Sequence, residues 1–356
     1  MKRCMFFWLF YGCFFSSTAL KAQPYCVVPD SATHTAVSIA NYISAQHSAE
    51  LEKVTCAYHW VVQHLVYDVD SMYSFMVGDQ DSLLVAATLR RRKGVCENYA
   101  GLLTALLREM KITAVVVKGY VKENGRLRRA GHSWVAFQYQ QQWWLCDPTW
   151  ESKTATHFNY WMKRGEELIE THMPFDPIWQ LLPNPWSYDD FSRGYRRSDA
   201  HIKNWQINDS VKAMLTSNDS AKYSAAYRRI KANGTPNLLV KTWLDYLNMK
   251  IAVEFEKQDA HNYQQVVTMI NEVSFTFNQY AEWRNGNAYL PLQIRFWKEK
   301  MQASLDLLSK AKAQANLIGK AFPNQQYDTG YMLERIQLLL DKCKVAAGWV
   351  ATLKVP

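Results

Sequence analysis

Three residues in separate stretches of the sequence, Cys96, His132 and Asp147, carry side chains that nucleophilic acyl chemistry requires. They stand in Gly94-Val95-Cys96-Glu97-Asn98-Tyr99-Ala100, in Gly131-His132-Ser133-Trp134-Val135-Ala136-Phe137 and in Trp144-Leu145-Cys146-Asp147-Pro148-Thr149-Trp150. A thiolate nucleophile, a histidine base and a carboxylate that orients the histidine are the parts of a catalytic triad. The sequence therefore points first to cysteine-dependent acyl transfer.

Cys96 stands where a helix is predicted to begin. Gly94 interrupts the preceding pattern, and the residues Cys96, Ala100, Leu103 and Leu107 then fall on one face of a helix over about 96–110. This spacing predicts that the thiol points inward. Unpaired N–H groups and the positive dipole end at a helix start favour a thiolate, and the Cys96 amide is a natural oxyanion donor. The alternative is an ordinary buried thiol.

His132 and Asp147 are predicted to lie on two short strands, about His132–Tyr139 and Gln142–Asp147. A buried strand at 113–121 and a turn at Asn124-Gly125 precede them. If Tyr139 faces Gln142 across a two-residue turn, His132 and Asp147 share one face within side-chain reach. A shift of one residue would separate them. Alternatively, His132 bonds to backbone and Asp147 caps the turn before Pro148.

The segments around these residues predict an α+β core followed by helices. Residues 31–69 and 82–92 have helical periodicity and precede the Cys96 helix and the antiparallel meander. We assign residues 23–197 to a catalytic domain, with its core at 50–155 and a Trp- and Pro-rich stretch at 156–197 that wraps it. Residues 198–356 are predicted to form an all-helical accessory domain.

The N-terminus predicts export. Lys2-Arg3, an apolar run over 5–15 and small residues up to Ala22 are typical of a signal peptide at 1–22, cleaved after Ala22. The protein is then periplasmic or secreted. An uncleaved anchor is the alternative, although the run is short for a spanning helix. No later segment is long and apolar enough to cross a bilayer, so no stable membrane span is expected after cleavage.

The net charge and the cysteine content limit which classes of binding partner and cofactor are expected. The formal charge of +9 falls to +6 without Lys2, Arg3 and Lys21, and no basic stripe with interleaved aromatics indicates nucleic acid. Cleavage leaves five cysteines, an odd count that implies a free thiol; the pairing of the four besides Cys96 stays open: Cys26, Cys56, Cys146 and Cys343. No paired Cys-x-x-Cys spacing indicates zinc, so neither a metal nor a cofactor is predicted.

Other residues near the predicted triad receive minor roles. Trp134, Trp150 and Tyr67 are candidate walls of a substrate cleft. The basic run 90–93 is interpreted as a solvated helix end. His157 and His172 lack partners at ligand spacing and are interpreted as ordinary loop residues.

Taken together, the three stretches resemble the transglutaminase-like superfamily, in a bacterial exported branch similar in pattern to the kyphoscoliosis-peptidase group. Trp60 and Tyr67-Asp68 match a sequence pattern of this family, in which a helix ends in Tyr-Asp before the cysteine helix. The resemblance covers about residues 50–155. It implies a papain-like core with Cys96 as nucleophile, His132 as base and Asp147 as orienting residue, and acyl transfer through a thioester. Calcium dependence belongs to the large animal enzymes, and no matching acidic loop is visible here.

The leading hypothesis is an exported cysteine hydrolase that cuts a peptide, amide or isopeptide bond in a protein or peptide substrate. Water is favoured over an amine as acceptor. Because the superfamily contains members that have lost catalysis, the alternative is a silent envelope binding or scaffold protein whose helical domain recruits a protein partner. A third hypothesis, an enzyme directed at cell-wall peptides, differs from the first only in its substrate.

Overall fold

The computed structural model describes residues 26–69, 82–154, 158–196, 206–286, 290–320, 327 and 329–353. The predicted signal peptide and His157 lie outside these residues. By internal packing the described chain divides into two units, with boundaries after Val117, His132 and Lys163. In the part of the chain that is described, no helix is both long and apolar enough to span a bilayer.

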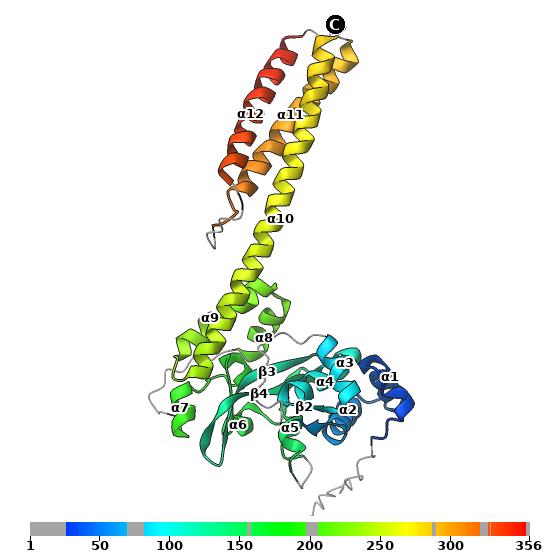
Figure 1. The fold of residues 1–356 in the computed structure, drawn as a ribbon, viewed down its shortest axis with the longest axis vertical. Helices are drawn as coiled ribbons and strands as arrows, with labels where there is room; N and C mark the ends of the chain where they lie inside the picture. The colour runs from blue at the N-terminus through cyan, green and yellow to red at the C-terminus, as the bar shows by residue number, and fades with distance from the viewer. Residues whose placement is uncertain are drawn as a thin grey trace, which may run out of the picture. The chain divides into compact units, whose positions relative to one another are not determined.

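The first unit is built around four helices that share one apolar core (Figure 1). They are α1 (Ala36–Gln46), α2 (Glu50–His64), α3 (Ser82–Arg91) and α4 (Cys96–Glu109), preceded by a 3₁₀ turn η1 (Asp30–Ala32). The face of α4 predicted to be apolar is buried along its whole length. A disulfide joins Cys26 to Cys56 in α2, which resolves the pairing left open above, and Cys146 and Cys343 are free thiols, as is Cys96.

A four-stranded sheet with the order β5-β4-β3-β6 follows α4. Its strands are β3 (Ala114–Glu123), β4 (Arg126–Tyr139), β5 (Gln142–Cys146) and β6 (His172–Pro174). The β4 strand begins six residues before the predicted start near His132. Asn124 and Gly125 have φ of 52° and 73°, so they form a tight turn that returns the chain directly into a strand.

The register of β4 on β5 is the predicted one, because Tyr139 pairs with Gln142 and Val135 with Cys146. Gln140 and Gln141 both have positive φ, 50° and 62°. This is a two-residue turn whose twist matches that of the strands. Continuing the register by one position places Asp147 opposite Trp134.

A second, two-stranded sheet precedes the cysteine helix. Strand β1 (Val66–Tyr67) runs parallel to β2 (Lys93–Gly94), and the Asp68 amide donates to the Gly94 carbonyl at 2.9 Å. The buried Asp68 carboxylate pairs with Arg91 at 3.1 Å and with Lys93 at 2.9 Å. The basic run is a solvated helix end, as interpreted, because Arg90 and Arg91 close α3 and the Arg91 side chain is 57% exposed. In addition, Arg91 and Lys93 neutralise a buried charge.

The second unit combines short elements with long helices. The short ones are α6 (Gly165–Leu168), η2 (Pro177–Gln180) and α7 (Tyr188–Arg193); α5 (Pro148–Glu151) belongs to the first unit. Helices α8 (Ile207–Thr216), α9 (Asp219–Asn233) and α10 (Leu238–Asn285) follow. One apolar cluster joins Met173 of β6 and Phe175 to Val240 and Leu244 of α10. Arg229 of α9 supports it with two hydrogen bonds to Asp176, at 2.8 and 2.6 Å.

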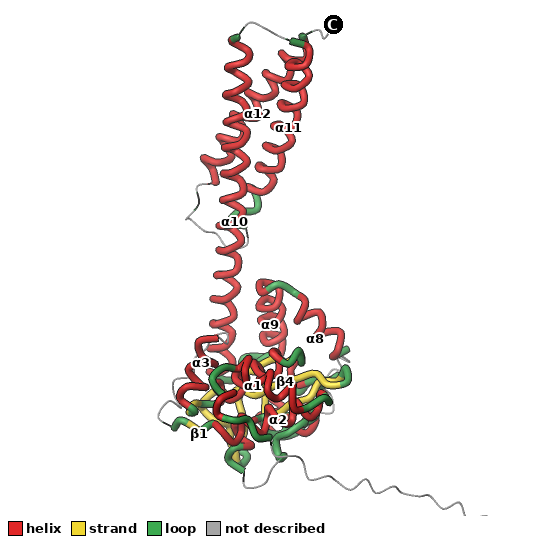
Figure 2. The backbone as a smooth tube through the Cα atoms, turned by 90° about the vertical axis from the view of Figure 1, so that its right-hand side faces the viewer, coloured by secondary structure: helices red, strands yellow, loops and turns green. Residues whose placement is uncertain are grey.

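The later part of α10 forms a three-helix bundle with α11 (Pro291–Ala315) and α12 (Thr329–Thr352), seen side by side in Figure 2. Two apolar clusters fill this bundle, and they include residues at helical spacing along α11, such as Ile294, Trp297 and Met301. The predicted fold class, an α+β core followed by a helical C-terminal region, is confirmed.

Candidate active site

Cys96 is the first residue of α4 and is buried, with 5% of its surface exposed. Asn98 fixes this helix start: its Oδ1 accepts from the Val95 amide at 2.9 Å and its Nδ2 donates to Thr88 at 2.7 Å. Gly94 is required here, because a Cβ at that position would lie 2.4 Å from the Cβ of Asn98. The Asn98 amide donates to the Val95 carbonyl at 2.9 Å, whereas the Cys96 amide, at the first helical position, has no carbonyl four residues earlier within the helix.

A buried hydrogen bond joins the neighbours of Cys96 and His132. Ser133 Oγ donates to Glu97 Oε2 at 3.0 Å, and both residues are buried. Since each residue is covalently bonded to a predicted triad residue, this bond ties the start of α4 to strand β4. The bond also gives each of these two buried polar side chains a hydrogen-bond partner, as buried polar groups require.

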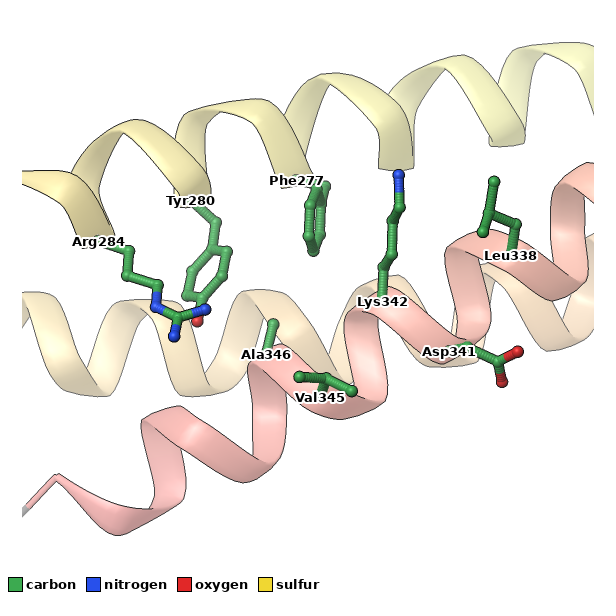
Figure 3. Close-up of a pocket in the computed structure, with 8 residues that line it drawn as sticks. All are labelled: Phe277, Tyr280, Arg284, Leu338, Asp341, Lys342, Val345 and Ala346. Atoms are coloured by element: carbon green, nitrogen blue, oxygen red, sulfur yellow. The ribbon is translucent and has the colours of Figure 1, made fainter.

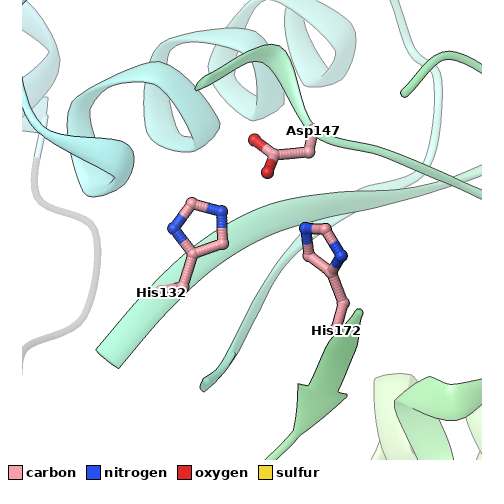
Figure 4. A group of neighbouring side chains, drawn as sticks. All are labelled: His132, Asp147 and His172. Atoms are coloured by element: carbon pink, nitrogen blue, oxygen red, sulfur yellow. The ribbon is translucent and has the colours of Figure 1, made fainter. Parts of the chain in front are cut away.

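His132 and Asp147 lie together, and His172 completes the group (Figure 4). All three are buried, and one polar atom from each lies within 4.8 Å of the others. In Figure 4 the Asp147 carboxylate stands over the two imidazole rings, each of which turns one nitrogen toward it. The two ring centroids are 5.6 Å apart.

Asp147 is held in place by the backbone around it. Its Oδ1 accepts from the amides of Thr149 at 2.9 Å and Trp150 at 3.1 Å, so it caps α5. Its own amide donates to the Tyr160 carbonyl at 2.9 Å. The sequence presented helix capping and pairing with His132 as alternative roles of Asp147. The structure allows both, because a carboxylate has two oxygens with separate acceptor sites.

The interpretation of His172 as an ordinary loop residue was wrong. It lies in β6, opposite Val121 of β3, and its Nδ1 is 2.8 Å from Thr171 Oγ1. A strand of three residues is too short for alternation of polar and apolar residues to be recognised in the sequence, and Pro174 suggests a turn. Proline is nevertheless tolerated in an edge strand such as β6. The weak signal available was the apolar pair Met173 and Phe175, which follows His172 with alternate spacing.

These same three residues are a group that can hold a metal ion. Two imidazoles and one carboxylate are a ligand set used by zinc, with a fourth position left for water or another donor.

A buried carboxylate organises the chain beside Asp147. Glu151 accepts hydrogen bonds from Tyr58 Oη at 2.9 Å, the Tyr160 amide at 2.8 Å and Thr154 Oγ1 at 3.1 Å. Burial, followed by the negative charges of Cys146 and Glu151, raises the pKa of Tyr58 well above its ordinary value. Burial likewise raises the pKa of the Cys146 thiol, which lies in the core, as its strand position predicts. Nothing in the sequence singled out Glu151.

The three candidate cleft residues differ in their environments. Trp134 is almost wholly buried. Trp150 is partly buried and packs edge-to-face on Tyr160, with centroids 5.3 Å apart. Tyr67 is also partly buried and carries Lys153 Nζ 4.2 Å from the centre of its ring. Tyr67 and Trp150 remain the accessible candidates for substrate contact.

The fold and the placement of these residues define a class of α+β protein. Its cysteine stands at the start of a helix, its histidine lies in a strand of an antiparallel sheet, and its aspartate directly follows the next strand. Comparison with known proteins agrees. Residues 37–148 match the transglutaminase-like superfamily. Kyphoscoliosis peptidase from Mus musculus is 29% identical over 182 residues, and the Homo sapiens protein is 27% identical. Each match covers 46% of this chain but only 27% of the relative, so the chain spans about a quarter of these relatives' length.

Two solved structures are also similar. The periplasmic domain of TgpA from Pseudomonas aeruginosa, bound to ethylmercury, is 24% identical and covers 35% of this chain and 47% of its own, with a TM-score of 0.27. A structure described as a TGase is 20% identical and covers 36% of this chain and 33% of its own, also with a TM-score of 0.27.

The chain thus carries a domain of the transglutaminase-like superfamily. The predicted resemblance to the kyphoscoliosis-peptidase group is confirmed. Members of this superfamily are generally enzymes, peptidases or transglutaminases, although some are inactive.

Proposed function

We propose that the protein is a cysteine hydrolase that cuts a peptide, amide or isopeptide bond. The observation that carries this proposal is the grouping of His132 with Asp147, together with Cys96 at the start of α4. The bond between Ser133 and Glu97 supports it, because it holds the segment of the nucleophile beside the segment of the base.

The proposed reaction proceeds in two steps. The Cys96 thiolate attacks the substrate carbonyl carbon, and the Cys96 amide stabilises the oxyanion. Protonated His132 gives its proton to the leaving amine, the C–N bond breaks, and a thioester remains. Water then attacks the thioester as His132 takes its proton, the C–S bond breaks, and the acid is released while the Cys96 thiolate and protonated His132 are restored. Asp147 holds the imidazole in the required tautomer throughout.

Selective alkylation tests the nucleophile. In the chain lacking residues 1–22, iodoacetamide at pH 7 should label Cys96 faster than Cys146 or Cys343, as located by peptide mapping. Since a thiolate is the reactive form, His132→Gln should slow this labelling, whereas His261→Gln, an exposed histidine of α10, should not. Equal and slow labelling of all three thiols would refute an activated nucleophile.

A catalytically silent binding or scaffold protein is the second candidate. The observation in its favour is burial, since Cys96, His132 and Asp147 each have 6% or less of their surface exposed. A substrate would need a local opening to reach the thiol. Substrate turnover that Cys96→Ala abolishes would exclude this candidate, whereas absent turnover with slow labelling would favour it.

The cellular setting belongs to the same proposal. Disulfides persist in oxidising compartments, so the Cys26–Cys56 bond supports export to the periplasm or beyond. We assign residues 23–197 to catalysis and 198–356 to an accessory helical domain, and we expect a protein or a cell-wall peptide as substrate. Release of ammonia or an amine without incorporation of a labelled amine would distinguish hydrolysis from amine transfer.

A further inference from the structure

Helix α12 displays apolar residues at a spacing of seven. Tyr331, Leu338 and Val345 are exposed by 61%, 55% and 69%. Seven residues are close to two full helical turns, so these side chains lie along one side of the helix. The opposite side of α12 supplies the bundle core through residues such as Ile336 and Cys343. The helix is therefore apolar on two sides, and among the residues that the structure describes only the side facing the bundle is covered.

Two of the exposed residues border a groove between α10 and α12 (Figure 3). The groove has a volume of about 290 Å³, and its apolar lining comes from Phe277 and Tyr280 of α10 and from Leu338, Val345 and Ala346 of α12. Helix α12 packs mainly on α11 and less extensively on α10. The α10–α12 side of the bundle consequently has an open apolar groove that side chains of a further helix can enter.

Charged residues border the same groove. Asp341 and Lys342 lie midway between Leu338 and Val345, and Lys342 Nζ stands 5.9 Å from the centre of the Phe277 ring. At one end, Arg284 lies 4.6 Å from the Trp349 ring centre. Along α12 the order is thus apolar, acidic, basic, apolar. Reversing the helix direction places a basic residue where an acidic one stood, so the pattern is complementary to its own antiparallel copy.

We propose that the groove is filled by helix α12 of a second copy of this chain, in antiparallel contact about a two-fold axis between Asp341 and Lys342. In this arrangement Leu338 lies opposite Val345 of the partner subunit, and Asp341 lies opposite Lys342 of the partner subunit. A two-fold interface repeats each contact twice. A parallel pairing would instead place Asp341 against its own copy, and like charges directly opposed are destabilising.

The neighbouring positions agree with this register. Counting outward from the axis, Arg335 falls opposite Gly348 of the partner subunit, Glu334 opposite Trp349 of the partner subunit, and Tyr331 opposite Thr352 of the partner subunit. No like charges meet among these pairs. Because the paired part of α12 runs from Tyr331 to Thr352, the contact is about 33 Å long at 1.5 Å per residue. An interface of one helix face belongs to the smaller size class, so the dimer should be reversible.

Charge exchange provides the test, measured by sedimentation equilibrium on the chain lacking residues 1–22. Wild type should dimerise with rising concentration. Asp341→Lys and Lys342→Asp should each weaken dimerisation by roughly tenfold or more, because both symmetric ion pairs become repulsive. An equimolar mixture of these two variants should recover the association as a heterodimer. Lys344→Asp, an exposed charge on another side of α12, is the matched control and should dimerise like wild type.

A cysteine pair checks the register separately. Leu338→Cys combined with Val345→Cys should give a disulfide-linked dimer on mild oxidation, since the two positions face each other across the axis. A wild type that stays monomeric up to several hundred micromolar would overturn the proposal and indicate a helix of another protein as occupant. Dimerisation that the two charge reversals leave unchanged, or that their mixture does not restore, would overturn it equally. Circular dichroism establishes that each variant retains its helices.

Discussion

Ser133 Oγ donates a hydrogen bond of 3.0 Å to Glu97 Oε2, inside the protein. One residue follows His132 and the other follows Cys96, so a single buried contact connects two segments that are 36 positions apart in the sequence. A carboxylate without solvent needs such a donor. We regard this pair as positioning residues for the proposed nucleophile and base.

Removing the donor tests that role. Ser133→Ala should slow alkylation of Cys96 by about tenfold and lower the free energy of unfolding by about 1–3 kcal/mol, because a buried charged acceptor loses a partner. Ser304→Ala is the control, since the buried Ser304 donates to the Lys300 carbonyl within α11, outside the proposed site. Lowered stability in urea melts with unchanged labelling of Cys96 would show that the pair is structural only.

Asp147 can be separated into its two roles by substitution. Asn and Ser both cap helices well, so Asp147→Asn and Asp147→Ser should keep nearly normal melting temperatures. Each lacks the carboxylate that orients His132, so turnover should fall by about 10² or more. Near-normal turnover in either variant would leave Asp147 as a helix cap alone.

His172 makes the site sensitive to zinc. Micromolar Zn²⁺ should slow alkylation of Cys96, because a metal held by His132, Asp147 and His172 occupies the proposed base. A chelator should reverse the effect. His172→Gln should weaken the zinc effect by about tenfold or more, because one of the three proposed ligands is lost. If His172→Gln and wild type respond to zinc equally, the metal binds elsewhere.

Alkaline pH should destabilise the first unit. Burial raises the pKa values of Cys146 and Tyr58 in the fold, so the native state keeps protons that the unfolded chain loses first. Stability is therefore fully present below the unfolded thiol pKa of about 8.5 and declines above it, by up to about 1.4 kcal/mol per pH unit for each group.

A Cys146→Ala variant isolates the thiol's share of that decline. It should be less stable at pH 7 by about 1–2 kcal/mol, since a buried sulfur is lost. Between pH 8.5 and 10 its free energy of unfolding in urea should fall less steeply than that of wild type. Parallel curves for the two proteins would assign the alkaline loss to other groups.

The sequence allowed the helix of Cys96, the hairpin register and the α+β class to be predicted, because each rests on local pattern. Helical spacing after Gly94 shows which face of α4 is buried, and the alternation around Tyr139 and Gln142 sets which residues share a face. The triad assignment rests on these patterns and stays a proposal.

The parts that were missed depend on contacts between distant residues. His172 enters the group through a three-residue edge strand, too short for periodicity. Glu151 looks like any surface glutamate, yet it collects bonds from Tyr58 and Tyr160. Asp68 likewise reveals its role only when Arg91 and Lys93 are brought beside it in space.

Helix α10 runs without a break for 48 residues. Near its start, Val240 and Leu244 pack in the cluster that contains Met173, the neighbour of His172; near its end, Phe277 and Tyr280 line the groove. Each inserted residue would rotate one end against the other by about 100°. The rotation between these two contact faces is therefore fixed by the length of α10. Both faces stay aligned only after insertions or deletions close to a whole number of turns, such as about seven or eleven residues.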